Sequence, residues 1–196
     1  MATPFPDPHR SRLTQETRNH VLELAGSMKR ADGDGATAMA APGRVDLFLA
    51  LLQDRLPVWL RILHDLSHLV GKGNVADNLL PIARAGIDYY LEIQSAALPA
   101  FSSPTVTVRY RAAVRGTGLG PMPDVAPLAA YLAAEQAIGR VSAHVDPMAS
   151  ARLLLAGCFQ HAYYEMLTGS DASLSRDDTA EEIVRELRLD AARQPA

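Results

Sequence analysis

Two histidines stand at a spacing that could hold a metal ion. His64 and His68 are four positions apart in the segment HDLSH, so on a helix both imidazoles would lie on one side and could bind the same ion. Asp65 occupies the place of the glutamate that activates water in zinc proteases with a similar motif. However, Asp65 is shorter than glutamate, and the sequence offers no clear third ligand. We therefore predict polar residues at the rim of a helical face, with no metal and no cofactor.

His161 stands close to two other residues with reactive side chains, Cys158 and Glu165. On a helix His161 and Glu165 would be neighbours, and an exposed pair of this kind contributes only about 0.3–0.5 kcal/mol. Because the flanking residues are apolar, a polar pair at a subunit interface or in a ligand pocket is the alternative. Cys158 lacks the positive setting that activates a thiol, so we interpret it as a small packed side chain. No catalytic residue is predicted, and we expect no enzyme.

A glycine-rich segment, GTGLGP at 116–121, superficially resembles a phosphate-binding loop. The dinucleotide-binding fingerprint requires a strand before the glycines, a helix after them and an acidic residue further on. The prolines of this segment are incompatible with the required turn. We therefore interpret these residues as a flexible loop between two helices.

Apolar residues recur every three or four positions along much of the chain, which is the pattern of helices that face a core. The stripe is clearest from 52 to 70, where Pro57 can introduce a kink. The alternation over 105–108 would also fit a strand, but such a strand would be isolated among helices. We predict helices over 14–28, 47–70, 75–98, 104–115, 124–138 and 147–167, and one more beginning near 178.

Short polar residues mark where these helices begin. Asn74, Asp124 and Asp146 each directly precede a predicted helix, and Asp146 is followed by the proline that favours a first helical position. Asp177 or Asp178 can cap the last helix. The chain is therefore predicted to be all-α, as a bundle of about six helices plus one N-terminal helix.

Composition limits the class of protein. Of the 196 residues 48% are hydrophobic and 21% charged, and the formal net charge is −3, which is ordinary for a soluble globular protein and gives no general reason to expect nucleic-acid binding. The single cysteine cannot form an internal disulfide. No apolar stretch is long enough to cross a membrane. We expect a cytoplasmic protein without a membrane partner.

The N-terminal part differs in composition from the remainder. Residues 1–13 are rich in proline, and the segment KRADGDGATAMAAPG at 29–43 has almost no large apolar side chain. Such segments cannot bury enough surface to order themselves. We predict a loose tail over 1–13, a remnant helix and flexible linker over 14–43, and a single helical domain over 44–196.

The segment from Pro127 to Leu167 resembles the C-terminal domain of TetR-type transcriptional regulators, in which a helix and a glycine turn precede an Asp-Pro cap and a helix of small apolar residues. The matching residues are Glu135, Gly139, Arg140, Val141, Asp146, Pro147 and the run LLLAG at 153–157. The segment 46–56 is similar to the helix that follows the family's DNA-reading unit. Residues 17–24 resemble its first helix.

The resemblance implies a regulator that binds an effector and forms a homodimer. Between the two matching parts the family carries a helix-turn-helix whose second helix enters the major groove. Here the residues from Lys29 to Arg44 contain no second amphipathic helix, so we expect a lost or truncated DNA-binding head and assign no DNA-binding residue. Two alternatives stay open: an intact sequence-specific repressor, and a small helical metal-dependent enzyme that uses His64, His68 or His161.

The resemblance also implies two sets of site residues. The effector is expected to be a small apolar or aromatic molecule, and its predicted contacts are Trp59, Leu63, Leu66, Tyr89, Tyr90, Ile93, Tyr110, Tyr131, Phe159 and Tyr163. The family dimerises through its last two long helices, which correspond here to 147–167 and 178–189. The predicted interface residues are Ala151, Leu154, Gly157, Cys158, His161, Ala162, Glu165, Ile183 and Leu187.

Overall fold

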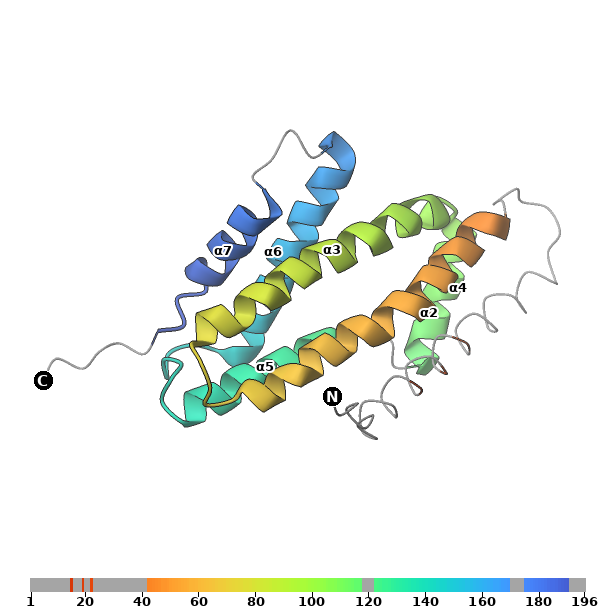
Figure 1. Cartoon of the computed structure of the whole chain (residues 1–196). Coiled ribbons are helices and arrows are strands. Elements are labelled where there is room, and N and C mark those ends of the chain that lie inside the picture. Colours follow the sequence, from red (N-terminus) through yellow and green to blue (C-terminus); the bar gives the residue numbers. More distant parts are fainter. Residues whose placement is uncertain are drawn as a thin grey trace, which may run out of the picture. The chain divides into compact units, whose positions relative to one another are not determined.

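A computed structural model describes Gln15, Asn19, Leu22 and residues 42–117, 122–169 and 175–190. These residues contain six α-helices, one 3-10 helix and no strand (Figure 1). The elements are α2 (Pro42–Asp65), η1 (Leu66–Leu69), α3 (Val75–Phe101), α4 (Pro104–Thr117), α5 (Met122–Ala137), α6 (Pro147–Thr168) and α7 (Arg176–Glu186). The predicted all-α class is therefore confirmed. No helix of the described residues is long and apolar enough to span a membrane.

Several helix ends follow from local sequence as predicted. The Asp146 side chain accepts hydrogen bonds from the backbone N–H groups of Met148 and Ala149, and α6 ends at Gly169, whose φ is +82°. The Asn74 side chain caps α3 through the N–H of Ala76 at 2.8 Å. These caps and this glycine act within one helical turn, so the sequence alone could indicate them.

Other boundaries differ from the predictions. Helix α2 begins at Pro42, inside the expected linker, and gives way to a 3-10 turn after Asp65. Helix α5 begins at Met122, so Asp124 lies within its first turn instead of preceding it. The cap of α7 is Ser175, not Asp177 or Asp178, because the Ser175 hydroxyl accepts from the Asp178 N–H at 3.1 Å. Residues 105–108 are helical rather than extended.

The described residues form two compact units. The first contains residues up to Arg61 together with 95–117, and the second contains 62–94 together with 122–190. The single domain expected over 44–196 is divided between the two units, and the first unit also includes the described residues before 44. The expected tail over 1–13 and nearly all of the expected linker lie outside the described residues, whereas Gln15, Asn19 and Leu22 have the helical backbone predicted for 14–28.

Three aromatic rings fill the first unit. Phe48 of α2, Phe101 at the end of α3 and Tyr110 of α4 contact one another edge to face, with ring centroids 4.8–5.8 Å apart. Such edge-to-face pairs add to the stability that their buried area provides. Trp59 is also buried in this unit. Burial raises the pKa of the Tyr110 hydroxyl, which keeps the phenol neutral.

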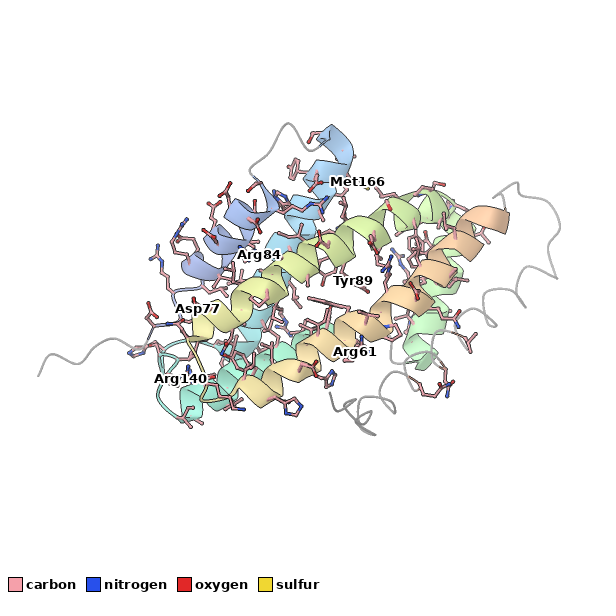
Figure 2. The ribbon with its side chains drawn as sticks, in the orientation of Figure 1. Arg61, Asp77, Arg84, Tyr89, Arg140 and Met166 are labelled. Atoms are coloured by element: carbon pink, nitrogen blue, oxygen red, sulfur yellow. The ribbon has the colours of Figure 1, made fainter. Side chains whose placement is uncertain are left out.

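A buried carboxylate holds one end of the second unit together. Glu135 of α5 is fully buried, accepts from the Gly71 N–H at 3.1 Å and lies 3.3 Å from the Arg140 guanidinium. Arg140 in turn donates to the carbonyls of Lys72 and Gly73 (Figure 2). Gly71 and Gly73 both have positive φ, a conformation that favours glycine. Glu135 and Arg140, which flank the predicted turn at Gly139, therefore hold the connection between η1 and α3 through these hydrogen bonds.

Candidate functional site

Three aromatic residues of the second unit contact one another, and we call them the aromatic cluster. Tyr89 and Tyr90 of α3 have ring centroids 5.2 Å apart, and Tyr90 lies 5.6 Å from Phe159 of α6. Both tyrosines are half-buried, whereas Phe159 remains 48% exposed. All three were predicted as effector contacts. Figure 2 labels Tyr89 on α3. The cluster offers apolar ring surface that a ligand can reach from solvent.

A carboxylate lies directly beside this cluster. The Tyr90 hydroxyl donates to Asp124 Oδ2 at 2.8 Å, and the carboxylate also accepts from the backbone N–H groups of Asp124 itself and Val125 in the first turn of α5. Burial raises the pKa of Asp124 above its usual value although these hydrogen bonds oppose the shift. Among the described residues no lysine or arginine pairs with Asp124. The negative charge is therefore held by dipoles alone.

Gln94 completes the group of side chains around the cluster. It lies one helical turn after Tyr90 on α3, only 6% exposed, and its Nε2 donates to the Phe159 carbonyl oxygen at 3.1 Å. Its Oε1 is buried and has no hydrogen-bond partner within the described part of the chain. A buried amide oxygen without a donor costs free energy unless a ligand or water supplies one. Neither Asp124 nor Gln94 was predicted as a site residue.

The other predicted effector residues lie elsewhere. Trp59 and Tyr110 belong to the first unit. Tyr131 is buried at the end that Glu135 organises, where its hydroxyl accepts from Asn78 at 3.0 Å. The remaining positions are core or helix surface: Leu63 and Leu66 are fully buried, Ile93 is half-buried and Tyr163 is exposed on α6. The structure thus brings together three of the predicted residues and adds Asp124 and Gln94.

A second polar group joins α7 to α3 and α6, and we call it the α7 network. Arg176 donates to both oxygens of Glu165, at 2.6 and 2.9 Å, and to Asp88 at 2.6 Å. His161 Nδ1 lies 3.0 Å from the Thr179 hydroxyl oxygen, and its Nε2 lies 3.6 Å from Glu165. Hydrogen bonds from Arg176 hold the pKa of Glu165 below its usual value. The predicted polar pair of His161 and Glu165 therefore connects helices within one protomer.

Arg84 adds a second link between α3 and α7. Its guanidinium lies 2.6 Å from Asp177 and 3.8 Å from Glu181 (Figure 2). These side chains are substantially exposed, so water and salt screen the attraction and each contact contributes little. They add a polar connection between α3 and α7 but little stability.

Helix α6 is apolar on the side that faces solvent as well as on the side that faces the core. We call its solvent side the outer face; its residues are Ala149, Arg152, Leu153, Ala156, Gln160, Tyr163, Tyr164 and Leu167, all exposed. Leu153 is 64% exposed and Leu167 58%. Within α6, which the structure describes in full, Arg152 is the one charged residue on this side. A helix that is apolar all round is normally covered on all sides.

The predicted interface residues that belong to α6 do not lie on this outer face. Ala151, Leu154, Cys158, His161 and Ala162 are buried within the protomer. Gly157 faces α7, since a Cβ built at this position would lie 2.9 Å from Ile183. Glu165 belongs to the α7 network, and Ile183 and Leu187 are half-buried. Small residues on α6 thus admit the protomer's own α3 and α7.

The other residues singled out for metal binding or nucleophilic chemistry, where the structure describes them, lie apart or are buried. His64 lies in the last turn of α2 and His68 in η1, so a change of helix type separates them. Among the described residues no group of three His, Cys, Asp or Glu side chains could hold a metal ion. Cys158 is fully buried, and burial raises the pKa of its thiol to about 12. This thiol is therefore protonated at neutral pH.

Comparison with protein-family models, with curated proteins and with solved structures returned no match.

Proposed function

We propose that the chain is a TetR-like regulatory protein whose helical body binds an effector and forms a homodimer, with a lost or truncated DNA-binding head. The observation that carries the proposal is the outer face of α6. The sequence resemblance implies dimerisation through this helix and α7, and the structure leaves one side of α6 uncovered. Large apolar side chains such as Leu153 and Leu167 on that side favour burial against a partner.

Symmetry makes this face suited to a second copy of the chain. In a two-fold dimer both copies contribute the same surface patch to the interface. An apolar helix face can therefore be covered by the identical face of a second copy, without a different partner protein. Full burial of a leucine or aromatic side chain contributes about 1.5–3 kcal/mol, and the outer face offers several. The proposed interface therefore lies on Leu153, Ala156, Tyr163 and Leu167 instead of the buried residues predicted from the sequence.

The aromatic cluster supports the effector-binding part of the proposal. It combines exposed ring surface with a carboxylate and a buried amide oxygen without a donor. Small-molecule sites in proteins have this composition, with apolar walls and a few polar groups that fix orientation. The absence of a DNA-reading head is proposed from the sequence of 29–43 alone, because residues 23–41 lie outside the described part of the chain.

Sedimentation velocity of the full chain at micromolar concentration tests the proposed dimer. We expect the wild type to sediment as a dimer and Leu153→Glu to weaken association by about a hundredfold or more, because each copy would bury a charge in an apolar interface. Val108→Glu is the matched control, since Val108 of α4 is also 64% exposed. A monomeric wild type, or equal effects of the two substitutions, would contradict the proposal.

A gel-shift experiment tests the missing head. We expect no sequence-selective binding to the DNA that flanks the gene at any salt concentration. Selective binding would instead favour the intact-repressor alternative and would leave the proposed dimer and effector site in place.

A further inference from the structure

The polar atoms beside the aromatic cluster are mainly hydrogen-bond acceptors. Tyr90 already donates its hydroxyl proton to Asp124, and the Gln94 amide nitrogen donates to the Phe159 carbonyl. The atoms that remain are Gln94 Oε1, which has no donor within the described residues, and the Asp124 carboxylate, which has no cation there. Aromatic faces also carry partial negative charge. The group therefore lacks a positive partner with N–H donors.

Two arginines of the second unit, Arg176 and Arg84, are already engaged. Arg176 donates to Glu165 and Asp88, and Arg84 pairs with Asp177 and Glu181. Each of these pairs satisfies a carboxylate outside the cluster. Neither of these two arginines can neutralise Asp124 without breaking one of these contacts.

From this arrangement we infer that Tyr89, Tyr90, Phe159, Asp124 and Gln94 bind an organic cation that has an aromatic or other hydrocarbon body and at least one N–H donor. This inference rests on the proposed effector function and names the chemical class of the effector. The rings contact the hydrocarbon body, and their faces attract the cationic group. The Asp124 carboxylate neutralises the positive charge, and Gln94 Oε1 accepts a hydrogen bond from an N–H group of the ligand.

Other ligand classes fit these atoms less well. An anion would meet the Asp124 carboxylate and the unpartnered Gln94 oxygen with no donor to offer either, and like charges at short range repel. A purely apolar molecule would use the rings but would cover both oxygens without pairing them, which weakens binding. A protonated amine is the class that satisfies the carboxylate, the amide oxygen and the rings together.

Isothermal titration of the full chain with two matched probes tests the inference. Naphthylmethylammonium and naphthylmethanol share one ring system and differ in the charged group. We expect the ammonium probe to bind at least about tenfold more tightly, which is the effect of one charge-assisted hydrogen bond. Asp124→Asn should reduce this preference to less than about threefold, because the asparagine oxygen can still accept from Tyr90 while the charge is gone.

Further variants separate charge from shape. Phe159→Ala should weaken both probes alike, and Gln94→Leu should weaken the ammonium probe about fivefold. Glu182→Gln, which removes one negative charge from the exposed side of α7, should change neither affinity. Circular dichroism checks that each variant is folded. If Asp124→Asn does not fold, the effect of Gln94→Leu on the affinity for the ammonium probe tests the inference instead.

Each other outcome would count against the inference in a distinguishable way. Equal affinity for the two probes, lost in Phe159→Ala, would overturn the cationic class but support the cluster as an effector site. A preference for the ammonium probe that survives in both Asp124→Asn and Gln94→Leu would overturn the assigned residues. Binding of neither probe to a protein that sediments as a dimer would overturn the inference while the proposed self-association stands.

Discussion

Two carboxylates of the second unit stand in opposite electrostatic situations. Glu165 of α6 receives two hydrogen bonds from Arg176 and a close histidine, and its pKa is lowered. Asp124 of α5 is held by one phenol and its own helix terminus, and burial raises its pKa. The first group closes contacts between helices within the protomer. The second keeps a charge without a counter-ion beside aromatic rings.

The difference indicates which polar group is structural and which can bind. A carboxylate that is paired with an arginine from another helix stabilises the fold, as Glu165 does in the α7 network. Where the carboxylate meets only dipoles, the missing cation can come from a ligand. The α7 network and the aromatic cluster both include residues of α6. One side of this helix can therefore stabilise the fold while another side contributes to a ligand site.

Removal of the arginine should have the largest effect on stability. Arg176→Ala leaves Glu165 largely buried without its cation, and we expect the free energy of unfolding to fall by about 2 kcal/mol. Arg176 itself is 43% exposed, so screening by solvent keeps the loss below that of a fully buried pair. Urea denaturation measures it. Arg185→Ala is the control, because Arg185 pairs only with the exposed neighbour Glu186, and equal losses would refute a structural role for the network.

Close packing between α6 and α7 should contribute next. In Gly157→Ala the new Cβ would lie 2.9 Å from two carbon atoms of Ile183, and we expect destabilisation by about 1 kcal/mol. Ile183→Ala in the same chain should relieve the clash, so the double variant should be more stable than the sum of the single effects predicts. Thermal unfolding of the four proteins completes this cycle, and strict additivity would show that the two residues do not meet.

Acid should act on the two carboxylates in opposite directions. The folded-state pKa of Glu165 lies below its unfolded value, so its contribution is present above that unfolded value and is lost as pH falls through the folded pKa. Denaturation at several pH values should show a shallower loss of stability towards acid for Glu165→Gln than for the wild type. Parallel curves for the two proteins would mean that Arg176 does not favour the charged form of Glu165.

The smallest effect is expected at Asp124. Its folded-state pKa is raised, so the folded protein binds the proton more tightly than the unfolded chain, and ionisation costs stability as pH rises through the window between the two values. Asp124→Asn should therefore leave the free energy of unfolding at neutral pH within about 0.5 kcal/mol of the wild type, or raise it slightly. A loss above 2 kcal/mol would identify Asp124 as a structural carboxylate like Glu165.

Local signals in the sequence were enough for the helices but not for their faces. The cap at Asp146 and the stop at Gly169 bounded α6 correctly because both act within one turn. The side of α6 that faces the core could not be chosen in the same way, because large apolar residues occur all round this helix. The prediction took the stripe of small residues as an interface between protomers, whereas that stripe packs against α3 and α7.

Contacts between distant residues explain what else the sequence could not supply. Asp124 and Tyr90 are 34 positions apart, and Arg176 and Asp88 are 88 apart, so neither pair leaves a local pattern. The sequence predicts Asp124 as a helix cap, whereas in the structure it lies in the first turn of α5. Tyr89, Tyr90 and Phe159 were among the predicted contacts because aromatic side chains suit a pocket between helices and the family resemblance implies one. The carboxylate beside them became visible only once the helices were packed.

Carbon-13 NMR of the side-chain carboxyl groups, with and without naphthylmethylammonium, reports on the pKa values of Asp124 and Glu165 in the free and the bound protein. Asp124 should titrate above its usual range in the free protein, and its pKa should fall when the ammonium probe binds, because a nearby cation favours the charged carboxylate. Glu165 should titrate below its usual range and not respond to the probe. An Asp124 pKa that stays unchanged at saturating probe, or a shift at Glu165 instead, would contradict the claim that Asp124 is the carboxylate reserved for a ligand.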